Sequence, residues 1–177
     1  MSKDTRDLLA SDVLEIMGWL EAAGVEVWLD GGWGHDALLR DQTRRHDDLD
    51  LVADVEDSSR LIDALAEHGF EVTERESSNA FVLIDSDDRQ VDVHAARFDE
   101  AGNGFYRMRD GEDWVFPAEG LTGEGVIAGR PVRCMTPELQ MLCKTGNFEP
   151  TQADHQDVRL LHARFGVPIP EMYRDRG

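Results

Sequence analysis

Two aspartates in one short acidic segment are the residues best suited to chemistry. In RRHDDLDL (44–51), Asp48 and Asp50 alternate with Leu49 and Leu51. Successive side chains of a strand point to opposite faces, so the aspartates share one face while the leucines enter the core. Their Cβ atoms then lie roughly 7 Å apart, which lets both carboxylates bind one or two hard cations. Mg²⁺ fits this pattern, because it binds a few carboxylates and keeps other positions for water and phosphate oxygens.

A second segment, QVDVH (90–94), repeats the alternation with Asp92 and His94 facing outward. If this strand lies beside the first, Asp92 completes a site of three carboxylates, whose repulsion is costly without a divalent cation. His94 would then act as a base or as a hydrogen-bonding partner of a carboxylate or substrate hydroxyl. The alternative is a solvated acidic strand for the first segment and a structural histidine for the second.

A glycine pair and two cations are candidates for holding a phosphate chain. Gly31-Gly32 follows an expected strand and precedes an expected helix, where bare backbone N–H groups can bind phosphate. The pair matches neither GxGxxG nor a P-loop, and a tight turn is the alternative. Arg44 and Lys144, one of only two lysines, could balance the charge of a triphosphate. For Lys144 the alternative is a surface residue at a helix end.

The rest of the chain supplies the elements that must position these residues. Apolar periodicity and capping signals predict helices over 4–23, 33–39, 58–67 and 151–165, and one from Pro137 to Cys143 or Lys144. Strands are expected over 25–29, 48–55, 70–73, 80–85 and 90–95, with two more inside 125–134. Residues 74–79 are expected to form a turn, and residues 101–113 a loop or hairpin over the site.

These elements predict an α+β domain with a small mixed sheet packed by helices and covered mainly on one side. We expect a single domain over residues 1–177 with a short C-terminal helical region at about 136–166.

Composition narrows the function classes. The chain has 37 acidic and 18 basic residues and a net charge of −19, which opposes broad contact with nucleic acid or anionic lipid. No apolar run approaches the 18 residues that span a bilayer, and the first residues lack a signal-peptide pattern. We therefore expect a cytoplasmic protein with neither nucleic-acid nor membrane partners. The two cysteines have no metal-ligand spacing and are expected to be buried thiols.

Several motifs together carry a family resemblance. WLDGGWG (28–34), RRHDDLDL (44–51) and VDVH (91–94) resemble the small antibiotic nucleotidyltransferases that modify lincosamides. EGVIAGRPVRC (124–134) is similar to the aminoglycoside 2″-adenylyltransferases, whereas TQADHQDVRLL (151–161) again resembles the lincosamide type. Both groups belong to the DNA polymerase β-like nucleotidyltransferase superfamily, so the resemblance implies that fold.

The resemblance also implies roles for individual residues. Asp48 and Asp50 would bind two Mg²⁺ ions together with the nucleoside triphosphate, and Asp92 would ligate the catalytic metal and help to activate the acceptor hydroxyl. The glycine pair Gly31-Gly32 and Arg44 would hold the phosphates. ATP or another nucleoside triphosphate would be the co-substrate, and the acceptor would be a small antibiotic.

The implied reaction is attack of a drug hydroxyl on the α-phosphorus, with AMP from ATP as the expected group and pyrophosphate as the leaving group. The aminoglycoside enzymes have a different residue where this sequence has His94, which leaves the acceptor open between lincosamide and aminoglycoside. A homodimer would let a one-domain enzyme wall its acceptor site. The alternatives are transfer to a protein or a tRNA end, and a non-catalytic or antitoxin-like partner built on the same fold.

Overall fold

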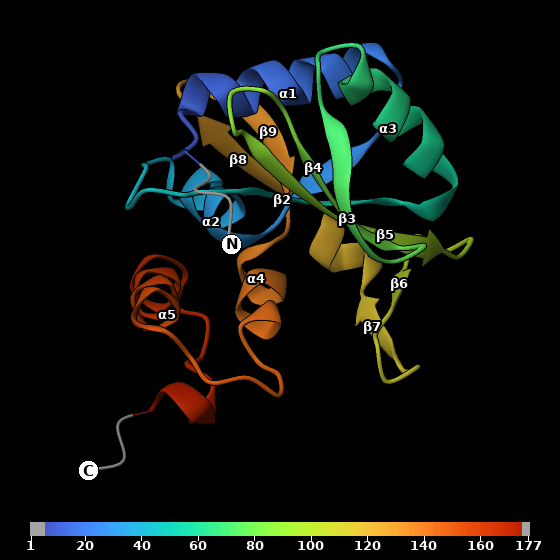
Figure 1. The fold of residues 1–177 in the computed structure, drawn as a ribbon. Coiled ribbons are helices and arrows are strands. Elements are labelled where there is room, and N and C mark those ends of the chain that lie inside the picture. The colour runs from blue at the N-terminus through green and yellow to red at the C-terminus, as the bar shows by residue number, and fades with distance from the viewer. Residues whose placement is uncertain (1–5, 175–177) are drawn as a thin grey trace.

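The computed structural model describes residues 6–174 and contains nine strands and five α-helices (Figure 1). The strands are β1 (Val27–Leu29), β2 (Leu49–Asp54), β3 (Glu71–Ser77), β4 (Ala80–Ile84), β5 (Gln90–Phe98), β6 (Gly104–Arg107), β7 (Asp113–Phe116), β8 (Gly123–Ile127) and β9 (Arg130–Cys134). The α-helices are α1 (Ala10–Ala22), α2 (Gly31–Leu39), α3 (Ser58–Ala66), α4 (Pro137–Cys143) and α5 (Gln152–Phe165). Among these residues, no helix is long and apolar enough to cross a membrane.

The strands form one mixed sheet in the order β3-β4-β5-β2-β1-β9-β8, and the β6–β7 hairpin continues from the end of β5. β2 pairs with β5 in parallel and with β1 in antiparallel orientation. The two strands that carry the acidic segments are therefore direct neighbours, although β3 and β4 separate them in the chain. This confirms the condition under which Asp92 joins the site.

Both faces of the sheet are covered, which corrects the expectation of one covered face. Leu49 and Leu51 of β2 belong to the larger core, which packs under α1 and α3 (Figure 1). Val52 points to the other face and is fully buried with Trp28 of β1 and Leu139 of α4 in a second cluster. Helix α4 and the segment around β7 bury this face, and they lie too far along the chain for local periodicity to reveal it.

Several element bounds differ from the expectations, and three of the differences bear on the site or the sheet. Helix α1 begins at Ala10, whereas residues 4 and 5 of the expected helix lie outside the described residues. Helix α2 begins at Gly31, so the glycine pair forms its first turn and does not precede it. The expected turn at 74–79 is mostly strand, because β3 continues to Ser77 along β4 through two register shifts. The capped helices α4 and α5 begin after Thr136 and Thr151, as the sequence predicts.

Candidate active site

Three aspartates meet at the start of the two central parallel strands. Asp48 precedes β2, Asp50 is the second residue of β2, and Asp92 is its register partner on β5. One carboxylate oxygen from each of the three lies within 4.8 Å of the others. Gln90 Nε2 donates a hydrogen bond of 2.8 Å to Asp92 Oδ1 and so fixes that carboxylate. The structure thus brings together all three carboxylates that the sequence singled out.

The electrostatics of this cluster favour a bound cation. Burial, together with the charges of Asp92 and Asp47, raises the pKa of Asp48 to about 7. Burial and the neighbouring charge of Asp48 raise the pKa of Asp50 well above its usual value, and burial raises that of Asp92. Such pKa values mean that the three negative charges are held together at a cost. Three converging carboxylates are the ligand set of a hard divalent cation, so the residues present fit Mg²⁺.

The glycine pair lies directly against this cluster. Gly31 has φ 58°, and a Cβ atom at this position would overlap the Asp50 carboxylate. A Cβ atom on Gly32 would overlap the His46 ring and lie 3.1 Å from Nη2 of Arg44. The backbone is held in place, because Gly31 N donates to Asp30 Oδ1 over 2.7 Å and Gln140 Nε2 donates to Gly31 O over 3.0 Å. Only glycine leaves room here for the start of α2 to approach the carboxylates.

The two candidate phosphate cations lie together on one acidic residue. Arg44 donates from Nε and Nη2 to the carboxylate of Asp157 over 3.3 and 3.1 Å. Lys144 Nζ donates to the same carboxylate over 2.9 Å, and over 2.9 Å to Asp154. Both cations are near the cluster, since Arg44 lies beside Gly32 and the charge of Lys144 acts on Asp50. The sequence predicted the two cations but not the carboxylate that gathers them.

A buried histidine and aspartate support Arg44 from its other side. Arg44 Nη1 lies 3.1 Å from Nδ1 of His46, and a guanidinium can only donate, so Nδ1 accepts. Nε2 of His46 therefore carries the hydrogen and donates to Asp36 over 2.5 Å. Although burial acts to raise it, hydrogen bonds from His35, His46 and Thr43 hold the pKa of Asp36 well below its usual range.

His94 shares the cluster's face of β5. Its Nδ1 is buried and has no hydrogen-bond partner among the described residues. The ring packs edge to face on Tyr106 with centroids 5.4 Å apart, and the charge of His94 acts to lower the pKa of Asp92. An orphaned buried nitrogen beside a carboxylate cluster has hydrogen-bonding capacity left for a ligand.

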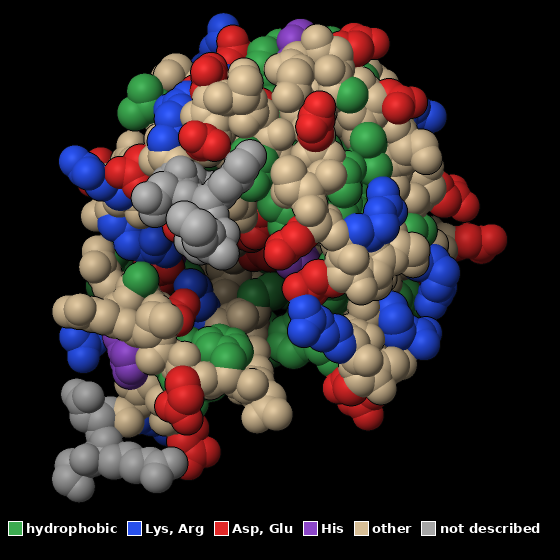
Figure 2. All heavy atoms as spheres, viewed as in Figure 1, with side chains coloured by type: hydrophobic (Ala, Val, Ile, Leu, Met, Phe, Trp, Pro, Cys, Tyr) green, Lys and Arg blue, Asp and Glu red, His purple; other side chains and the backbone are tan. Residues whose placement is uncertain are grey.

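All three clustered aspartates are partly exposed, and the molecular surface has a hollow on the face drawn in Figure 2. Figure 2 shows this hollow on the face between the α4–α5 part and the β6–β7 part, with acidic side chains and a histidine side chain inside it. Hydrophobic side chains line the lower part of the same hollow. β6 and the turn that follows it fall in the segment 101–113, where a loop or hairpin is expected, whereas β7 continues beyond it to Phe116.

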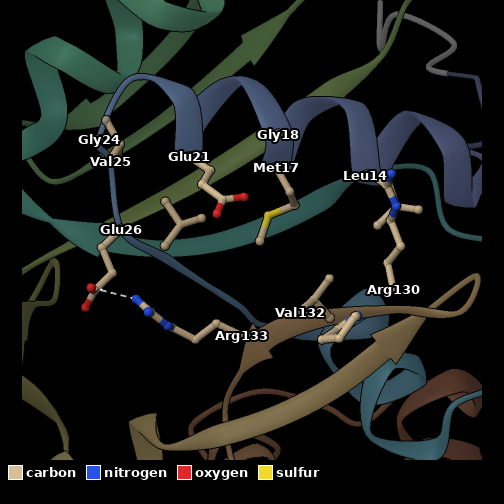
Figure 3. A pocket seen from close by; sticks show the side chains of 12 residues that line it. Leu14, Met17, Gly18, Glu21, Gly24, Val25, Glu26, Arg130, Val132 and Arg133 are labelled. Atoms are coloured by element: carbon tan, nitrogen blue, oxygen red, sulfur yellow. Dashed lines mark ion pairs between the residues drawn. The ribbon is translucent and has the colours of Figure 1, made fainter.

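A cavity of about 620 Å³ lies elsewhere, between α1 and the strands β1 and β9 (Figure 3). Met17, Val25 and Val132 line it with apolar side chains, and Arg133 pairs with Glu26 over 2.7 Å. None of the three clustered aspartates lines it.

Asp157 and His46 are the site residues that sequence reasoning missed. Asp157 had a detectable signal, because it lies four residues before Leu161 and so on the apolar stripe of its helix. A charged residue at such a position needs a buried partner. His46 gave no comparable signal, since its contact with Asp36 joins an irregular segment to a helix.

The sequence of this chain matches one protein family and several known proteins. The sequence profile of the aminoglycoside-2″-adenylyltransferase family matches residues 12–161. A lincosamide resistance protein of Staphylococcus haemolyticus is 27% identical over 150 residues, which cover 85% of this chain and 92% of that protein. A 2″-aminoglycoside nucleotidyltransferase of Klebsiella pneumoniae is 36% identical over 121 residues, which cover 68% of this chain and 63% of that protein.

Solved structures show the same fold. The lincosamide antibiotic adenylyltransferase LnuA, with lincomycin bound, matches with a TM-score of 0.79 and 25% identity over 89% of this chain and 99% of that one. ANT(2″)-Ia in complex with adenylyl-2″-tobramycin matches with a TM-score of 0.69 and 25% identity over 87% of each chain. The α+β nucleotidyltransferase fold and the resemblance to these two groups of enzymes, both expected from the sequence motifs, are thereby confirmed.

Proposed function

We propose that this chain transfers AMP from ATP to a hydroxyl of an aminated antibiotic. The chain belongs to the aminoglycoside-2″-adenylyltransferase family and is a nucleotidyltransferase, which supports this proposal. The observation that carries the proposal is the convergence of Asp48, Asp50 and Asp92 beside the glycine pair that begins α2. A carboxylate cluster next to a bare helix N-terminus suits a triphosphate that arrives with its cations.

The acceptor is proposed to be a lincosamide or an aminoglycoside. Drugs of both classes carry amines that are protonated at neutral pH, and a protein of net charge −19 attracts them. Coverage supports a lincosamide as the first acceptor to test, because the sequence match covers 92% of the lincosamide resistance protein but only 63% of the Klebsiella enzyme. The aminoglycosides follow, since the family profile and the higher sequence identity favour them.

Asp48, Asp50 and Asp92 would hold two Mg²⁺ ions. When bound, such ions neutralise the triphosphate and stabilise both the attacking and the leaving oxygens of an in-line displacement. Two observations support this assignment of Mg²⁺. The cluster offers carboxylate oxygens as ligands, and the raised pKa values of Asp48 and Asp50 indicate negative charge that no nearby cation fully balances.

The chain's own groups would bind and orient the substrates. The backbone N–H of Gly32 would donate to a phosphate oxygen, since that of Gly31 is already bound to Asp30, and Arg44 and Lys144 would balance phosphate charge. Asp92 or His94 would accept the proton of the drug hydroxyl as its oxygen attacks the α-phosphorus. The bond from the α-phosphorus to its bridging oxygen breaks, pyrophosphate leaves, and the drug carries AMP as a phosphodiester.

A mass-spectrometric screen tests the proposal. The chain is incubated with ATP, MgCl₂ and panels of lincosamides and aminoglycosides, and each drug is examined for an added nucleoside monophosphate. Asp48→Asn should abolish the product, whereas Asp47→Asn should retain it, because Asp47 is an exposed neighbour outside the carboxylate cluster. Equal turnover by wild type and Asp48→Asn would contradict the assignment of the site.

The same preparation tests the alternatives. A protein that co-purifies with the chain, together with no binding of MgATP, would favour a non-catalytic partner. Labelling of a protein or tRNA in place of every drug would favour a macromolecular acceptor. The net charge of −19 opposes the tRNA alternative, because no excess of basic residues exists to neutralise its phosphates.

A further inference from the structure

Asp157 is the centre of a buried charge cluster that joins four segments of the chain. Its side chain is 0% exposed and accepts hydrogen bonds from Arg44, in the segment before β2, and from Lys144, at the end of α4. Its backbone carbonyl on α5 accepts from His35 Nε2 of α2 over 3.1 Å. A carboxylate this deeply buried is tolerated only with such partners.

The exposure of the three charged groups is uneven. The side chains of Arg44 and Lys144 are 28% and 14% exposed, whereas Asp157 is closed to solvent. A ligand can therefore contact the two cations from solvent but not the acid. Two cations this close would repel each other, and the shared carboxylate lets them remain together.

Both cations are held on more than one side. Arg44 is fixed by Asp157 and by the hydrogen bond from Nη1 to His46. Lys144 Nζ is fixed by Asp157 and Asp154. These contacts remove the rotamer freedom that long cationic side chains would otherwise lose when a ligand binds.

We infer that Asp157 is a positioning residue for ATP, which holds Arg44 and Lys144 toward the polyphosphate without touching the nucleotide. This inference rests on the proposed function. The placement supports it, because Arg44 borders Gly32, and Lys144 ends the helix α4 whose Gln140 donates to Gly31 O, so both cations lie near the glycine pair proposed to hold the phosphates. If Asp157 served only the fold, its two cationic partners would not need to remain partly exposed to solvent.

The test compares Asp157→Asn with Tyr173→Phe. The first change removes the charge that orients both cations, whereas the second removes a buried hydrogen bond to the backbone of the same Lys144 and leaves its ammonium contacts intact. The dissociation constant of MgATP is measured by calorimetry without drug. KM values for ATP and for the drug are measured together with kcat, and thermal midpoints report folding.

We expect Asp157→Asn to raise the dissociation constant and the KM of ATP by about tenfold or more. Loss of a residue that orients a metal ligand has an effect of this size. The KM of the drug should change by less than about twofold. Tyr173→Phe should lower the thermal midpoint and leave both ATP constants near wild type. If Asp157→Asn does not fold, Asp157→Glu serves the same purpose, because it keeps the charge and displaces the carboxylate by one methylene. We expect a raised ATP constant there too.

Two outcomes would overturn the inference. One is a folded Asp157→Asn or Asp157→Glu with wild-type ATP constants. The other is an equal loss of ATP and drug affinity in Asp157→Asn and Tyr173→Phe, which would indicate a structural role alone. Failure of the proposed function looks different, because wild type itself would then modify no drug.

Discussion

Asp50 on β2 is the direct register partner of Asp92 on β5, so two carboxylates of parallel neighbouring strands stand on the same face of the sheet. Parallel pairing fixes this relationship along the full contact of the strands, and Leu49 and Leu51 anchor it from the core side. The sheet therefore sets the spacing of the carboxylates, and no loop needs to do so. A substitution at either position should change chemistry more than folding.

Asp92→Asn tests this directly. The amide is isosteric, so the fold should survive, but the group proposed to ligate metal and help to deprotonate the hydroxyl is lost. We expect kcat to fall by about 10²–10⁴-fold, the range for a positioned base. Pyrophosphate release measures the rate, and Asp54→Asn, at the far end of β2, is the control. A loss of less than about tenfold would exclude Asp92 from the chemistry.

The metal-free protein should lose stability as pH rises from about 4 to about 7. Burial and neighbouring negative charge raise the pKa of Asp48 to about 7, so over this range the folded state binds more protons than the unfolded state. Fewer protons on the unfolded chain make the free energy of unfolding fall with pH. Thermal unfolding in EDTA at several pH values measures the slope, and Asp48→Asn should flatten it. An unchanged slope in that variant would contradict the prediction.

Divalent cations should reverse this loss. At pH 8 the clustered carboxylates are more fully ionised, so MgCl₂ should raise the thermal midpoint of wild type, at roughly 2–4 °C per kcal/mol of binding free energy for a chain of this size. EDTA should return the midpoint to its starting value. In Asp50→Asn the shift should shrink or vanish, whereas Asp47→Asn should keep it. Equal shifts in all three proteins would indicate binding outside the cluster.

Gly31→Ala and Gly24→Ala separate strain from steric fit. Both glycines have positive φ, 58° and 72°, so alanine costs about 1–2 kcal/mol of stability at each. Only at Gly31 would the new Cβ also meet the Asp50 carboxylate, whereas nothing lies within 4 Å at Gly24. We expect the backbone strain to lower the free energy of unfolding of both variants by similar amounts. Only Gly31→Ala should lose turnover, because its Cβ atom also meets the Asp50 carboxylate. Chemical denaturation and pyrophosphate release, measured on both variants, check this.

Salt should weaken the binding of a cationic drug. The net charge of −19 raises the local concentration of positively charged acceptors, and added salt screens this attraction as the Debye length falls from about 10 Å at 0.1 M to about 3 Å at 1 M. The KM should rise with NaCl for an aminoglycoside with several amines more than for a lincosamide with one. If the KM rises equally for both drugs, salt acts on nucleotide binding or on folding and not on the attraction of the cationic drug.

The sequence predicted those parts of the site that depend on local rules. Strand periodicity placed Asp48 and Asp50 on one face. The cap at Thr136 located α4, and apolar periodicity with Gly166 as the stop located α5. Asp92 could join the site only if its strand lay beside the strand of Asp50. The motif resemblance favoured this arrangement, and the pairing of β2 with β5 confirms it.

Contacts between distant segments could not be predicted in this way. Arg44 and Asp157 are 113 residues apart, and no period of two or 3.6 residues links them. The burial of Val52 depends in the same way on α4, which lies far along the chain. Local patterns indicate which face a residue occupies, whereas packing between elements decides what lies on that face.

The position of Asp157 on α5 also has a consequence for biosynthesis. Protein chains are made from the N-terminus, so every strand of the sheet, the three clustered aspartates and both cations leave the ribosome before Asp157 does. Until α5 docks, Arg44 and Lys144 have no shared carboxylate to gather them. The sheet and its carboxylates can thus assemble first, and the proposed polyphosphate-binding side is completed last, when α5 packs on α2.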